Sequence, residues 1–484
     1  MLLLQKSVTR TILVSSLSLS FAVPVYSCLA NESVLPVAKQ ENKKVEWYQS
    51  PWAYTAYGIV GIGLLAGGVY GIYAALNGAD GNNSGSWIQV GSDIGGLPNE
   101  GIGNSLSMSK DGQIIGMTQY SDLTQEGGFT VYKYNNVTQN WQPFGNKYTE
   151  EDSKMGGISL SSSGDTFAFG LQKYWDGSLA CAVKLKDGNW SDFGETNHEV
   201  DEGIDDSCFA PEDMESLFGA SVSMSSNGER IAVGAPADDF GGNKSGLVSV
   251  YQYNPTGNFW GKLGKNIAGE ASGDHSGHAV SLSPNGETLA VGAPNNDRGG
   301  ENAGHVRVYQ FDRLNGEWIQ IGSDINGESA KDYLGSSLSI SEDGRVLAVG
   351  APGHDEPGGV NHGLVKVYKL QGNSWNQIGK DIIGEESGEM LGMRNSISLS
   401  SDGSKVAVGS FKDGAAKIFE LKDGEWKYYG KQGDLSKSLL KADETGPIGS
   451  SVSLSGSGNR VIIGAPQFGL NGEGIVRAFD YMPN

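Results

Sequence analysis

A pattern of alternating hydrophobic and polar residues recurs seven times between residue 86 and the C-terminus. Each unit contains a segment in which serine alternates with aliphatic residues, as in Gly335–Ser341, and then an apolar run, as in Leu347–Pro352. A second alternating segment follows, as in Leu364–Leu370, and the next segment opens with a tryptophan, as at Trp375. Alternation with a period of two is typical of half-buried β-strands, and short apolar runs are typical of buried ones. The pattern therefore predicts four strands per unit, which we name A, B, C and D.

Short turns that contain glycine, such as Glu342-Asp343-Gly344, join A to B and C to D, so each unit is predicted to be an antiparallel meander. One four-stranded sheet cannot bury both of its faces, and we expect the units to stack. Strand A carries serine at two positions in all seven units, where small side chains would relieve crowding near a central axis. The D strands open with Trp87, Trp141, Trp190, Trp260, Trp318, Trp375 and Trp426. The sequence thus predicts an all-β fold, a seven-bladed β-propeller over residues 86–484.

The two ends of this region are expected to meet. Its first strand, Trp87–Ile94, is a D strand, and its last, Ile475–Tyr481, is a C strand. The first strand can therefore complete the last sheet, which closes the ring and removes an exposed sheet edge.

Several units carry a pair of motifs, clearest in Phe218-Gly219 followed by Gly234-Ala235-Pro236. This pair resembles the FG-GAP repeat of integrin α-subunit propellers, and the resemblance implies an extracellular interaction platform. Calcium-binding members of that family have an acid-rich loop between strands A and B. Here that connection is a plain turn, such as Ser109-Lys110-Asp111-Gly112, so the family's metal sites are not carried over.

The first 85 residues differ from the repeats. Residues 1–30 have a basic start, a short apolar middle and small residues near a cleavage point, which predicts a signal-like leader; a mitochondrial or plastid presequence is the alternative. A linker is expected at 31–53, a transmembrane helix at 54–77 and a Gly/Asn/Ser linker at 78–85. Glycines spaced four apart within the helix would allow a helix-mediated dimer, and the alternative is a flexible, poorly hydrophobic helix without self-association.

The orientation of this single-pass membrane protein is open. Lysines before the helix and acidic residues after it place the propeller on the extracytoplasmic side, whereas a cleaved leader followed by one stop-transfer helix would place it inside. We expect the outward orientation, in which Asn136, Asn189 and Asn243 are glycosylation acceptors and Cys181 and Cys208 form a disulfide. The alternative for the cysteines is two unpaired small hydrophobic side chains.

The chain has 35 basic and 56 acidic residues and a net charge of −21, which excludes nucleic acid as an expected partner. No nucleophile–base pair, phosphate loop or metal motif stands out, so we expect no enzyme activity and no cofactor other than a weakly held Ca²⁺. His275 and His278 have no further ligand at fixed spacing, which argues against zinc.

The B–C and D–A loops are longer and more charged than the other turns and are expected to form the binding surface. Asp239, Asp297 and Asp355 follow the Gly-Ala-Pro prolines at one spacing, and with Asp238 they are the candidate Ca²⁺ ligands; the alternative is that they accept hydrogen bonds from turn amides. Tyr174 and Trp175 are candidate partner contacts, and so are the three equivalent aspartates. We expect a non-catalytic, membrane-tethered platform that binds a protein or glycan; a lectin or a propeller glycosidase is the alternative.

Overall fold

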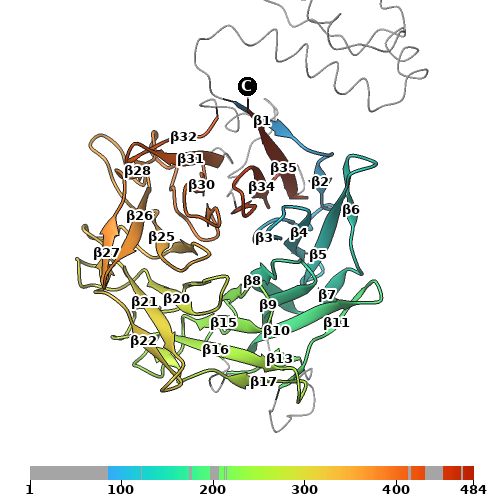
Figure 1. Cartoon of the computed structure of the whole chain (residues 1–484), viewed down its shortest axis with the longest axis horizontal. Coiled ribbons are helices and arrows are strands. Elements are labelled where there is room, and N and C mark those ends of the chain that lie inside the picture. The colour runs from blue at the N-terminus through green and yellow to red at the C-terminus, as the bar shows by residue number, and fades with distance from the viewer. Residues whose placement is uncertain are drawn as a thin grey trace, which may run out of the picture. The chain divides into compact units, whose positions relative to one another are not determined.

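The computed structural model describes residues 85–121, 123–173, 177–196, 207–211, 213, 215–412, 416–430, 451–469 and 472–483. In these residues the chain is all-β and forms seven antiparallel sheets around one axis, the predicted seven-bladed propeller (Figure 1). The predicted leader, first linker and transmembrane helix lie outside the described residues. Within the described residues, no helix has the length and apolar character needed to cross a membrane.

The blades follow one another along the chain. Blade 1 contains β3 (Leu106–Met108), β4 (Ile114–Ser121), β5 (Glu126–Asn135) and β6 (Asn140–Pro143). Blade 2 contains β8 (Ser153–Leu160), β9 (Thr166–Lys173), β10 (Gly177–Lys186) and β11 (Asn189–Asp192). Blade 3 contains β14 (Ser221–Met224), β15 (Arg230–Ala235), β16 (Leu247–Asn254) and β17 (Phe259–Lys262), and the short β12 (Glu195–Thr196) pairs with β17 in parallel.

The later blades repeat the order. Blade 4 contains β19 (Ala279–Leu282), β20 (Thr288–Ala293), β21 (His305–Asp312) and β22 (Glu317–Gln320). Blade 5 contains β24 (Ser337–Ile340), β25 (Val346–Ala351), β26 (Leu364–Gln371) and β27 (Ser374–Gln377). Blade 6 contains β29 (Ile397–Leu399), β30 (Lys405–Gly409), β31 (Ala416–Lys422) and β32 (Glu425–Tyr428). Blade 7 contains β33 (Ser451–Leu454), β34 (Arg460–Ala465), β35 (Ile475–Met482) and β1 (Ser86–Gln89).

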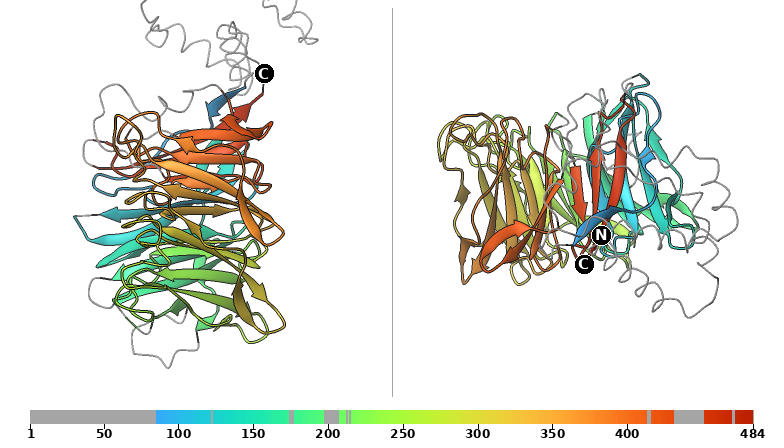
Figure 2. Two further views of the ribbon diagram at one scale, coloured as in Figure 1. Left: turned by 90° about the vertical axis from the view of Figure 1, so that its left-hand side faces the viewer. Right: turned by 90° about the horizontal axis from the view of Figure 1, so that it is seen from above.

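Blade 7 confirms the predicted closure of the ring. The first strand, β1, pairs antiparallel with the last, β35, with Trp87 opposite Tyr481. In Figures 1 and 2 the blue β1 lies beside the dark red β35. The described part of the propeller therefore has no open blade edge at its chain ends.

The outer strand is not continuous, and the prediction of one strand over Trp87–Ile94 is wrong in this respect. β1 ends at Gln89, and β2 resumes at Ile94 against the same partner, β35. The break falls at Gly91, whose φ of +74° is left-handed backbone that a β-strand does not accommodate. β2 spans Ile94–Gly95, and equivalent second segments in other blades are β7 (Tyr148–Glu150), β13 (Cys208–Phe209), β18 (Ile267–Ala268), β23 (Ile325–Asn326) and β28 (Ile382–Ile383).

A belt of tryptophans joins each blade to the one before it. Each D-strand tryptophan donates its Nε1–H to the backbone carbonyl three residues after the preceding tryptophan, at 2.5–3.1 Å. For example, Trp141 Nε1 donates to the carbonyl of Val90 at 3.0 Å. The glycine of the strand break makes room for the incoming ring, because a Cβ on Gly91 would lie 2.7 Å from Cδ1 of Trp141. The spacing of Trp and Gly that is repeated in the units is thus explained by the packing of each tryptophan ring against the glycine of the preceding blade.

The two sets of serines in strand A also join the blades and their turns. We call Ser107, Ser159, Ser223, Ser281, Ser339, Ser398 and Ser453 the serine ring. Oγ of six of its members accepts a backbone N–H from strand A of the next blade, at 2.9–3.1 Å. The second set, such as Ser341, closes the A–B turn instead: its Oγ accepts the N–H of Val346 at 2.9 Å and donates to Asp343 at 2.6 Å. Both sets therefore have bonding roles beyond their small size.

Candidate functional site

The meander topology places the B–C and D–A loops at one end of every blade, and we call this end the loop face. Asp239, Asp297 and Asp355 are all exposed on it. In each case Oδ1 accepts a backbone N–H from later in the same B–C loop; Asp297, for example, accepts the N–H of Asn302 at 2.8 Å. These carboxylates therefore brace their own loops, which is the alternative that the sequence left open.

The remaining calcium candidate, Asp238, is buried, and its Oδ1 accepts the N–H of Phe240 at 2.8 Å. Within the described residues, none of the four candidate aspartates belongs to a group of three potential metal ligands. Tyr174 and Trp175 lie outside the described residues. The predicted glycosylation acceptors Asn136, Asn189 and Asn243 are exposed.

Buried acids in the D–A loops were not found by sequence reasoning. Asp332 accepts the N–H of Ser329 at 3.2 Å and contacts Nδ1 of His354, in the B–C loop, at 3.3 Å. Burial raises the pKa of Asp332 above its ordinary value. Asp274 has the same place in the preceding repeat and accepts hydrogen bonds from Ala271 and Asn296. An acid stands three residues before the glycine in four of the units, at Glu100, Asp274, Asp332 and Glu389, and this repetition is the signal that could have identified these braces.

One group on blade 4 has the composition of a metal site. Glu270, His305 and Asp324 each present a ligand atom within 4.8 Å of the others. However, Arg307 lies among them: its Nε is 3.0 Å from Oδ1 of Asp324, and its guanidinium also contacts Glu270. Since a guanidinium already neutralises these carboxylates, a divalent cation would meet a fixed positive charge. We interpret this group as an ion-pair network.

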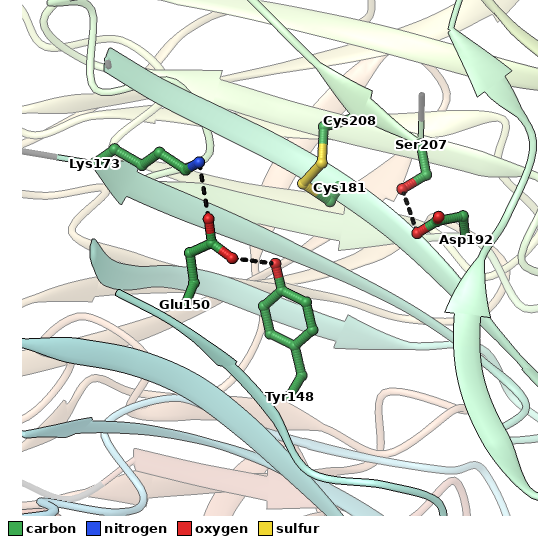
Figure 3. The surroundings of a disulfide bond; sticks show 7 residues. All are labelled: Tyr148, Glu150, Lys173, Cys181, Asp192, Ser207 and Cys208. Carbon is green, nitrogen blue, oxygen red and sulfur yellow. Dashed lines mark hydrogen bonds and ion pairs between the residues drawn. A yellow bond between two sulfur atoms is a disulfide. The ribbon is translucent and has the colours of Figure 1, made fainter. Parts of the chain in front are cut away.

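The disulfide joins Cys181 of β10 to Cys208 of β13 (Figure 3). Next to it, the hydroxyl of Ser207 donates to Asp192 at 3.0 Å. The start of β13 is therefore fixed by two adjacent contacts, this hydrogen bond and the disulfide. This anchoring positions Phe209, whose ring lies 4.2 Å from that of Tyr251 and 5.6 Å from that of Trp260. The disulfide thus delivers an aromatic residue from one blade's outer edge into the core of the next.

A pocket of about 650 Å³ opens beside this aromatic cluster. Phe209, Phe218, Tyr251 and Trp260 contribute to its wall, although each is itself buried. Acidic groups and one exposed ring stand at its edge, namely Asp213, Asp238, Asp239 and Phe240. The pocket therefore combines an apolar interior with carboxylate acceptors.

Several loops of the loop face, on different blades, carry exposed apolar side chains. Phe240, at the pocket, is 69% exposed, and Val360 occupies the equivalent loop of blade 5 with 60% exposure. Other large apolar residues exposed in loops of this face are Leu97, Leu123 and Leu217. Exposed apolar groups on loops next to charged ones are typical of interaction surfaces.

A family model confirms the repeat resemblance over part of the chain. The family model described as FG-GAP repeat matches residues 260–309. A search of curated proteins found no match. Similar solved structures include the β-propeller domain of Cps50 (Swd1) from Myceliophteria thermophila, which has 11% identity and a TM-score of 0.47 over 81% of this chain and 98% of that one.

Two further solved structures have comparable similarity. Hydrazine synthase from Kuenenia stuttgartiensis is 15% identical, with a TM-score of 0.46 over 78% of this chain and 94% of that one. A periplasmic gluconolactonase from Pseudomonas aeruginosa is 14% identical, with a TM-score of 0.45 over 67% and 83%. Identities this low carry no inference about activity. The chain is a seven-bladed β-propeller that contains an FG-GAP repeat.

Proposed function

We propose that this protein is a non-catalytic binding module, tethered to a membrane through residues 54–77, whose loop face binds a protein partner outside the cytoplasm. The observation that carries the proposal is the exposed Phe240 of the loop face, which lines a pocket together with buried aromatic side chains and aspartates. A rigid scaffold that presents such loops is a common arrangement for recognition.

The charge of the loop face suggests the chemistry of the partner. Asp239 and Asp213 stand at the pocket, and Asp297 and Asp355 are exposed on neighbouring loops. Each of the equivalent aspartates uses Oδ1 within its own loop, and among the described residues no partner occupies Oδ2, which is available to a ligand. A basic segment with an aromatic or aliphatic anchor would complement this surface.

A glycan is the second candidate, because aromatic rings beside carboxylate and amide groups also suit sugars. Asn266 lines the same pocket and accepts a hydrogen bond from Ser249 at 2.9 Å, so its amide nitrogen is oriented by that contact. Both candidate ligands would contact Phe240, so substituting this residue does not distinguish them. Direct binding assays with proteins and with glycans do.

The full-length chain in detergent would be tested against arrays of extracellular protein domains and of glycans. We expect Phe240→Ala and Val360→Ser to weaken binding at least about ten-fold, as loss of an interface anchor does. The matched controls are Leu314→Ser and Val137→Ser, which change residues 96% and 93% exposed in C–D turns at the other end of the blades. Equal loss in both pairs of variants would refute the assignment to the loop face.

Two further tests address the remaining parts of the proposal. Protease treatment of intact cells should digest or release the propeller; protection until the membrane is opened would contradict the outward orientation. Turnover in a screen of glycoside substrates would contradict the non-catalytic role and favour a propeller glycosidase.

A further inference from the structure

The A strands of all seven blades enclose an axial channel with a volume of about 240 Å³. Its wall contains the whole serine ring, together with His278, Arg394 and Asn395 near the loop-face ends of the strands. Among the described residues that line the channel there is no aspartate or glutamate, although the chain has a net charge of −21. The channel is therefore a region of positive charge within a strongly acidic protein.

The serine ring offers hydrogen-bond donors to this channel. Oγ of Ser281, for example, accepts the N–H of Ile340 at 3.1 Å, and five other members accept in the same way. A hydroxyl whose oxygen already accepts such a bond still has its proton to donate. No described residue takes these protons, so they are available to whatever occupies the channel.

Arg394 supplies the charge. It comes from the D–A loop of blade 6 and reaches across the axis to blade 3, where it donates to the carbonyl of Ala220. Figure 1 shows these two blades, labelled by β30 and β15, on opposite sides of the ring. No described carboxylate forms an ion pair with Arg394. Arg394 is partly buried, and a guanidinium that loses hydration without a counter-ion is destabilising, a cost that an anion beside it would reduce.

Two neighbours complete the donor set. Burial, together with the charge of Arg394, lowers the pKa of His278 to about 4, so its imidazole is neutral at pH 7 and has one N–H to donate. Asn395 donates from Nδ2 to the carbonyl of Asn104 at 3.3 Å, which orients its amide at the same end of the channel.

We propose that the axial channel binds one small tetrahedral oxyanion, phosphate or sulfate, between the guanidinium of Arg394 and the hydroxyls of the serine ring. A tetrahedral oxyanion presents acceptors in several directions, which matches donors that converge from a ring. The guanidinium fork suits two of its oxygens, and the hydroxyls suit the others. This site does not depend on the partner proposed for the loop face.

Isothermal titration calorimetry of the full-length protein with sodium phosphate, at constant ionic strength, tests the proposal. We expect one phosphate per chain and a loss of affinity of about 10- to 100-fold in Arg394→Gln, as for a charge-assisted hydrogen bond. Arg298→Gln is the control, because Arg298 is exposed on the loop face and pairs with Asp324 at 2.7 Å. Unchanged affinity in Arg394→Gln, or equal loss in Arg298→Gln, would overturn the proposal.

Thermal unfolding gives a second measurement. Phosphate at about one hundred times Kd should raise the Tm of the wild-type protein by about 3 °C, and sodium chloride of the same ionic strength should not. In chloride, Arg394→Gln should unfold no earlier than the wild type, because it removes a charge that lacks a partner. Arg394→Lys keeps the charge without the fork and should bind phosphate more weakly than the wild type. An equal Tm rise in chloride and phosphate, or full affinity in Arg394→Lys, would refute the site.

Discussion

The closure of the ring by β1 can be tested by comparing two equivalent tryptophans. Trp87 is 7% exposed and donates to the carbonyl of Tyr429 at 2.7 Å; Trp318 is 9% exposed and donates to the carbonyl of Leu263 at 2.9 Å. The first joins blade 7 to blade 6 through a strand from the other end of the chain. The second joins two blades that are consecutive in sequence.

Replacing either tryptophan by alanine removes a buried ring and leaves a carbonyl without its donor. Large-to-small substitutions of buried aromatic residues cost about 3–5 kcal/mol. For about 400 residues this corresponds to a decrease of about 5 °C in Tm. Because Trp87 also packs edge-on against Tyr429 and Tyr481, at 5.9 and 5.6 Å, we expect Trp87→Ala to be at least as destabilising as Trp318→Ala.

Far-UV circular dichroism during heating measures both variants without depending on the removed fluorophore. The informative comparison is between the two variants, since both lose the same side chain and the same kind of hydrogen bond. If Trp318→Ala lowered the Tm by several degrees and Trp87→Ala left it unchanged, β1 would not hold the ring closed, and the reasoning would be refuted.

Three further predictions concern the disulfide, a histidine and a glycine. Cys181→Ser opens a loop of 27 residues and should reduce the free energy of unfolding by about 3–4 kcal/mol in denaturant titrations. Reducing agent should not lower the free energy of unfolding of this variant any further. A further decrease would contradict the assignment of the disulfide. Burial lowers the pKa of His278 to about 4, so between pH 6.5 and 4 only the unfolded chain takes up this proton, and the free energy of unfolding falls as the pH drops through that window. His278→Gln should remove about 2–3 kcal/mol of this pH dependence. An unchanged pH profile in the variant would contradict the prediction. Gly322→Ala should lower the Tm more than Gly316→Ala. Both glycines have a positive φ, but only a Cβ at Gly322 would lie close to the next tryptophan, 2.7 Å from Cδ1 of Trp375. Equal decreases in Tm would mean that backbone strain alone causes them.

Blade number, strand order and ring closure could be predicted from the sequence because they depend on local patterns repeated seven times. The break in each outer strand could not, since it arises from a contact between blades: Gly91 accommodates Trp141 of the next unit. The bonding role of the serine ring was missed for the same reason. Ser281 contacts the backbone of Ile340, 59 residues away, and alternation within one strand does not reveal such a partner.

The candidate site was less predictable. The equivalent positions of Asp239, Asp297 and Asp355 were evident, but their hydrogen bonds within the loops depend on backbone conformation. The pocket beside Phe209 depends on a disulfide within the sheet of blade 2, and the sequence left that pairing open. Arg394 contacts Ala220, 174 residues earlier, because the ring brings blades 3 and 6 to opposite sides of one axis. Only the assembled toroid places these groups together.

The pairing of β1 with β35 also sets a minimum interval between the synthesis of the first strand and its incorporation into a sheet. The N–H of Gly85 donates to the hydroxyl of Tyr481, a partner 396 residues later in the chain. At about 5–20 residues per second, translation of that interval takes roughly 20–80 s. During this time the first strand has no partner, and its edge can pair with other nascent chains. Any product truncated before β35 would retain this exposed edge permanently, so premature termination should yield aggregates rather than smaller propellers.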